Sequence, residues 1–155
     1  MDVTYDKHEP TPHQTFLAER IEVELAVRVR FARTVEPDGG NGPSILFSLH
    51  TRSAELSVRL ELYQDSYHIY ANEAEVRILL PHAEALDEWE EAIVDATRRL
   101  LAQPLRIRVN RPAVLKWLPT EGAIYFSDGA TGHWAGNLGA GRGHEQVFDR
   151  WYEPA

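Results

Sequence analysis

The chain contains no cysteine, which excludes disulfides, thiolate metal ligands and a cysteine nucleophile. It has no apolar run of 18 residues and no apolar segment near its start, so we expect no membrane helix, no signal peptide and a cytoplasmic protein. Lysine is nearly absent, since 14 of the 16 basic residues are arginine. The net charge of −8 disfavours nucleic-acid binding, which requires neutralisation of phosphates, and is compatible with a basic partner or simply with solubility.

The length of 155 residues predicts one domain. Residues 1–14 are polar and hold two prolines, so we expect a flexible arm there. Residues 15–110 are expected to form the core of sheet and helix, and residues 111–155 an irregular cover.

Alternating apolar residues predict strands through most of the core. Residues 21–31 alternate over eleven positions, which is typical of a half-buried strand. The apolar set expected to face the core is Ile21, Val23, Leu25, Val27, Val29 and Phe31. Further strands are expected around residues 45–49, 56–62, 67–70, 75–80 and 105–109, with a short one at 123–126. Short turns separate the first five, so they should form an antiparallel meander to which the sixth strand returns.

One long helix is expected between residues 83 and 102. Apolar residues recur there at helical spacing, at Leu86, Trp89, Ile93, Ala96 and Leu100. Acidic residues occupy its first half and two arginines its last turn, as the helix dipole favours. The expected fold class is therefore α+β: a meander of five to six antiparallel strands, one long amphipathic helix packed on one face, and an irregular glycine- and aromatic-rich C-terminal segment.

The glycine-rich segment matches no phosphate-binding motif. Seven of the ten glycines lie between Gly122 and Gly143, but residues 136–143 fit neither phosphate-loop spacing nor the elements that flank such loops. Asp128, His133 and His144 could converge on a metal only through a loop geometry that the sequence does not specify, and no zinc spacing occurs. The Gly-x-Ser-x-Gly elbow is also absent. We therefore predict no metal, no cofactor and no catalytic residue.

Arginines provide the first candidate binding group. Two expected strands carry arginine pairs on their outer faces, Arg28 and Arg30 on the first and Arg106 and Arg108 on the sixth. If those strands were neighbours, the guanidinium groups would grip a carboxylate or phosphate. The alternative is cross-strand pairing with glutamates on a solvated face.

Aromatic residues of the C-terminal third provide the second candidate binding group. The segment either folds back over the core or presents Trp134 among glycines as a recognition surface. The residues predicted to bind a ligand or partner are Arg106, Arg108, His133, Trp134 and Arg142.

Two classes of function remain open. The lack of a catalytic motif and the surplus aromatics favour a non-catalytic binding module that recognises a protein partner, like an inhibitor, an immunity protein or a chaperone. The alternative is a small-molecule or anion-binding protein, or an enzyme, with a pocket between the sheet and the glycine-rich loop. We expect a monomer or a homodimer without nucleic-acid or membrane partners.

Overall fold

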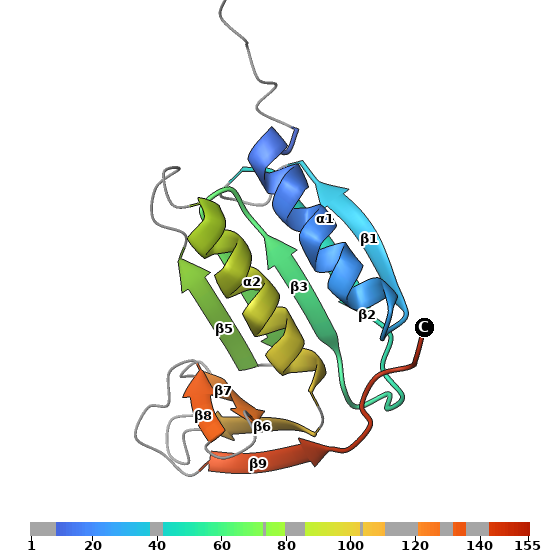
Figure 1. Ribbon diagram of the computed structural model, residues 1–155. Helices are drawn as coiled ribbons and strands as arrows, with labels where there is room; N and C mark the ends of the chain where they lie inside the picture. Colours follow the sequence, from blue (N-terminus) through green and yellow to red (C-terminus); the bar gives the residue numbers. More distant parts are fainter. Residues whose placement is uncertain are drawn as a thin grey trace, which may run out of the picture.

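A computed structural model describes residues 9–37, 42–72, 74–79, 86–102, 104–110, 121–127, 132–135 and 143–155. In chain order the elements are α1 (Pro12–Ala26), β1 (Phe31–Glu36), β2 (Ser44–Leu49), β3 (Val58–Leu62), β4 (Ser66–Ala71), β5 (Ala74–Leu79), α2 (Leu86–Leu101), β6 (Leu105–Asn110), β7 (Glu121–Ser127), β8 (Gly132–Ala135) and β9 (Gly143–Phe148). The fold is α+β, and both helices lie on the same face of the larger sheet (Figure 1).

The five-stranded sheet is an antiparallel meander, and four of its strands, β2 to β5, lie where the sequence predicts strands. Its strands follow in the order β1-β2-β3-β4-β5, each paired antiparallel with the next. The tight turn between β4 and β5 holds Asn72 at φ 53, a left-handed conformation that asparagine tolerates. The Asn72 side chain also accepts a hydrogen bond from the Ser57 backbone and so ties this turn to the start of β3.

The prediction of a strand at residues 21–31 is wrong, because most of that segment belongs to α1. The helix begins with a reciprocal capping box between Thr11 and Gln14, and Pro12 occupies its first turn. Ile21 and Leu25, four residues apart, are buried, whereas the intervening Val23 is exposed. Two other predictions change because of α1. The described residues contain two long helices rather than one, and the expected arm does not reach residue 14, because α1 begins at Pro12.

The core lies between the helices and the sheet. Phe47, Leu60, Ile69 and Tyr67 of the central strands face α1 and α2 and are fully buried. Tyr67 also exchanges a 2.8 Å hydrogen bond with Thr97 of α2, so the buried phenol has a partner. Burial against this sheet explains the strong amphipathic pattern of α2.

Residues 105–109 form a strand as predicted, but that strand does not return to the meander. β6 instead begins a second antiparallel sheet with the order β8-β7-β6-β9. The C-terminal third therefore contains strands rather than only irregular cover. The remaining parts of the expected cover, residues 111–120, 128–131 and 136–142, lie outside the described residues.

A C-terminal strap, which we define as residues 151–155, returns to the first sheet. Trp151 is only 2 % exposed and belongs to the hydrophobic core. Isolated bridges join Val29 to Pro154 and Thr51 to Tyr152. The aromatic end of the chain thus closes one end of the core at Trp151.

Candidate functional site

The predicted binding residues fall on the second sheet, where the register brings some of them into one line. Arg106 lies opposite Tyr125, and Tyr125 lies opposite Trp134. His133, next to Trp134 on β8, lies opposite Phe126 of β7. Arg108 follows two residues after Arg106 on β6, with Glu145 of β9 opposite it.

The expected cluster of four arginines does not form. Arg28 and Arg30 lie between α1 and β1 rather than on a strand beside β6, and Arg30 makes a 3.8 Å ion pair with Glu153 of the strap. Arg142 lies outside the described residues. The strand pairing thus places two predicted residues, Arg106 and Trp134, in one line across the second sheet.

A first arrangement that the sequence reading missed is an apolar stripe on α1. The stripe, defined as Phe16, Val23 and Val27, is 44 %, 55 % and 74 % exposed. Spacings of seven and four residues place all three on one side of a helix, and this side is opposite buried Ile21 and Leu25. Water therefore faces a row of large apolar side chains along most of α1.

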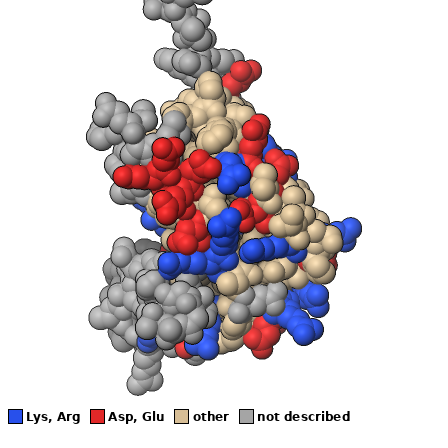
Figure 2. All heavy atoms as spheres, in the orientation of Figure 1, with Lys and Arg blue, Asp and Glu red and all other residues tan. Residues whose placement is uncertain are grey.

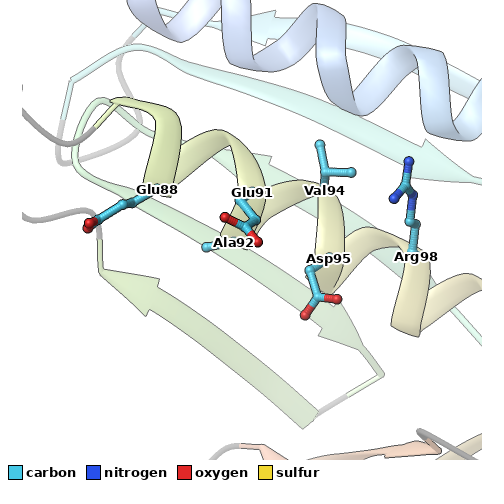
Figure 3. A pocket seen from close by; sticks show the side chains of 6 residues that line it. All are labelled: Glu88, Glu91, Ala92, Val94, Asp95 and Arg98. Atoms are coloured by element: carbon cyan, nitrogen blue, oxygen red, sulfur yellow. The ribbon is translucent and has the colours of Figure 1, made fainter.

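Next to α1, the outer side of α2 carries an acidic groove. The groove is an open hollow of about 480 Å³ lined by Glu88, Glu91, Ala92, Val94, Asp95 and Arg98. In Figure 3, Val94 and Arg98 extend from α2 toward α1, while Asp95 points away from it. Figure 2 shows acidic side chains gathered over the N-terminal half of α2, with arginine side chains beside them toward α1. Within the described part of the chain, Glu88 and Glu91 make no ion pair, so their charge is uncompensated.

Ion pairs fix the seam between the two helices. Arg20 of α1 forms a 2.7 Å ion pair with Glu90 of α2. Arg98 of α2 donates hydrogen bonds to both carboxylate oxygens of Glu24, at 2.8 and 3.1 Å. The hydrogen bonds from Arg98 hold the pKa of Glu24 below its ordinary value despite burial of the carboxyl group. The seam therefore keeps the stripe and the groove in a fixed relation.

The second missed arrangement lies on the face of the five-stranded sheet opposite the helices. His68 of β4 is 6 % exposed although no described helix covers this face. Its Nε2 lies 2.8 Å from Ser66 Oγ, and its Nδ1 lies 3.0 Å from Glu75 Oε1 and 3.2 Å from Tyr70 Oη. We call Ser66, His68 and Glu75 the imidazole relay.

Tyrosines enclose the relay. The ring of Tyr63 meets His68 edge-on at 5.0 Å between centroids, and that of Tyr70 is stacked with it at 6.0 Å. Burial, aided by the carboxylate of Glu61, raises the pKa of Tyr63 to about 12. Burial and the same carboxylate also raise the pKa of Tyr70 to about 12. Both phenols are therefore protonated hydrogen-bond donors throughout the neutral range, and Tyr63 donates to Glu61 at 2.9 Å.

Partial signals for both arrangements exist in the sequence. His68 and Tyr70 alternate along the strand predicted at residues 67–70 and hence share a face, whereas Ser66 lies just before the expected start of that strand. The stripe spacing is visible only once residues 16–27 are assigned to a helix.

Metal-binding groups and membrane-spanning helices can be assessed for the described residues alone. No group of three or more histidine or acidic side chains there is arranged to hold a metal ion. Likewise, no helix in those ranges has the length and apolar character needed to cross a membrane.

Comparisons of the chain with protein-family models, with curated proteins and with solved structures find no match.

Proposed function

We propose that the protein is a binding module whose helix layer docks a basic, amphipathic helical segment of a protein partner. The observation that carries the proposal is the position of the exposed apolar stripe of α1 beside the acidic groove of α2. Exposed apolar surface rimmed by polar residues is typical of interaction sites.

Charge selects the kind of partner. Glu88 and Glu91 make no ion pair among the described residues, and the chain as a whole carries −8. A partner with lysines and arginines along one side would gain favourable contacts with the groove and faster encounter through the overall field. An acidic partner would instead be repelled by these carboxylates.

Dimensions favour a helix as the docking segment. The groove residues run from Glu88 to Arg98, and ten residues of helix span about 15 Å. The stripe runs from Phe16 to Val27, the residue that caps the C-terminal end of α1. A partner helix of three or four turns would place apolar side chains at i, i+3, i+4 and i+7 over the stripe and its basic side over the groove.

A designed peptide tests the proposal directly. The probe is a fluorescein-labelled helical peptide with leucines at i, i+3, i+4 and i+7 and lysines elsewhere, and its counterpart replaces every lysine by glutamate. Fluorescence anisotropy should show that the lysine peptide binds and the glutamate peptide does not, with affinity falling as salt rises.

Matched variants separate docking from non-specific attraction. Glu91→Lys and Val23→Ser should each weaken binding about tenfold or more, which corresponds to one lost hot-spot contact. Glu55→Lys and Val147→Ser change an exposed acid and an exposed valine outside the helix layer and should leave affinity within about twofold. Equal binding of both peptides, or equal loss in all four variants, contradicts the proposal.

A second candidate function follows from the register of the second sheet. Arg106 and Trp134 lie in one line through Tyr125, which supports anion or small-molecule binding on that face. Arg106→Ala would then remove a ligand-induced rise in melting temperature in a screen with small carboxylates and phosphates. The helix-layer proposal predicts no such effect.

A further inference from the structure

The imidazole relay orders three groups as covalent catalysis requires. The Ser66 hydroxyl contacts one nitrogen of His68, and a carboxylate of Glu75 contacts the other, at 2.8 and 3.0 Å. A hydroxyl thus contacts an imidazole, which contacts a carboxylate. The same order joins a nucleophile, a general base and the acid that orients the base. The relay lies on the sheet face opposite the helices and so does not depend on the proposed docking surface.

The contacts select the tautomer that activates the serine. The ionised carboxylate of Glu75 only accepts hydrogen bonds, so His68 Nδ1 must carry the proton that it donates to Glu75. In neutral imidazole this leaves Nε2 with a lone pair, directed at the Ser66 hydroxyl. The Tyr70 hydroxyl, 3.2 Å from Nδ1, shares the same proton as a second acceptor.

Packing holds the base in this geometry. A histidine on a solvated sheet face ordinarily samples several rotamers, but the ring of His68 packs against the rings of both Tyr63 and Tyr70. Arg59 stacks over the Tyr70 ring at 4.5 Å and restrains it from the neighbouring strand. Such rigid support of the reacting group is the condition for efficient proton transfer.

The relay is mostly enclosed, because Ser66 is only 7 % exposed and His68 only 6 % exposed. Ser66 is the first residue of β4 and follows directly after the exposed turn residues Gln64 and Asp65. The side chain of Glu75 is 35 % exposed, so the acid of the relay remains in contact with solvent.

We propose that Ser66 is an activated nucleophile that accepts an acyl group from a small activated ester. The Ser66 oxygen forms a bond to the carbonyl carbon while its proton passes to His68 Nε2. The bond between that carbon and the leaving-group oxygen then breaks, and the leaving group departs with the proton from Nε2. Water, deprotonated by the same nitrogen, releases the acid and restores the Ser66 hydroxyl.

The test uses p-nitrophenyl acetate with the full chain. Intact-mass and peptide mass spectrometry should find one acetyl group on Ser66, formed together with one equivalent of p-nitrophenol. Ser66→Ala should abolish the adduct, and His68→Asn should slow acylation by about a hundredfold or more, the usual contribution of a general base. Ser48→Ala, on the same sheet face and exposed, should have no effect.

A cysteine scan keeps the proposal falsifiable where a relay variant fails to fold, as judged by circular dichroism. Because the chain has no cysteine, Ser66→Cys and Ser48→Cys each carry a single thiol. Iodoacetamide should alkylate Ser66→Cys with a rate midpoint at lower pH than Ser48→Cys, since a neighbouring imidazole favours the thiolate. Acetylation that persists in Ser66→Ala, or alkylation of Ser66→Cys that is no faster at neutral pH than that of Ser48→Cys, overturns the proposal.

Discussion

Trp151→Ala should destabilise the protein more than any change to an exposed residue. Trp151 is 2 % exposed, belongs to the main hydrophobic core and meets the ring of Tyr152 edge-on at 4.9 Å. A buried tryptophan removes about 150–250 Å² from water, which at about 25 cal/mol per Å² gives an upper value of about 4–6 kcal/mol. Large-to-small core substitutions at such sites cost about 3–5 kcal/mol, and we expect a loss in that range.

Trp151→Phe provides the matched control. The indole Nε1 is buried and has no hydrogen-bond partner, so phenylalanine keeps much of the packing and breaks no hydrogen bond. Its cost should be near 1 kcal/mol. Urea unfolding monitored by circular dichroism measures both. If Trp151→Ala costs under about 1 kcal/mol, or if both variants cost the same, then the aromatic ring does not close the core as described.

Two further predictions concern buried polar groups, and the same unfolding assay tests both. The pKa of Glu24 is lowered in the folded state by Arg98, so its stabilisation is present above the ordinary carboxyl pKa and is lost as pH falls through the folded value. Glu24→Gln should therefore flatten the decline of the urea midpoint below about pH 5, and parallel pH profiles would refute this. Gln14→Ala removes two 2.8 Å hydrogen bonds to the carbonyls of Pro43 and Leu62 and should cost about 2–3 kcal/mol. A cost under about 0.5 kcal/mol would show that water replaces the amide there.

Strands β2 to β5 of the meander could be predicted because each of them is defined locally. Alternation in residues 45–49 and 56–62 has no helical reading, and each connection is short enough to impose an antiparallel neighbour. The first helix could not be separated from a strand by the same means. Ile21 and Leu25 are four residues apart, and this spacing satisfies both the strand period and the helix period. The capping box at Thr11 and Gln14 is the local signal that decides between them.

The candidate surfaces could be predicted only in part. The chemistry of Arg106 and Trp134 predicts a binding role for each, but only the strand register shows that they lie in one line. The imidazole relay required a contact between strands. Ser66 and His68 alternate on one strand, but Glu75 reaches them only because β4 and β5 pair with Tyr70 opposite Glu75. Pairing register depends on turn geometry, which side-chain periodicity does not encode.

The C-terminal strap has a consequence for the order in which the protein folds. Meander strands pair across short loops, whereas Arg52 Nε bonds the Tyr152 carbonyl across 100 residues, and Arg30 and Glu153 are joined through the backbone. Closing a long loop costs entropy before any contact repays it. The meander should therefore form first and the strap last, so that a kinetic intermediate has native strand pairing in the larger sheet while Trp151 is still in water. Amides of β3 and β4 should gain hydrogen-exchange protection during refolding before the Glu153 amide does.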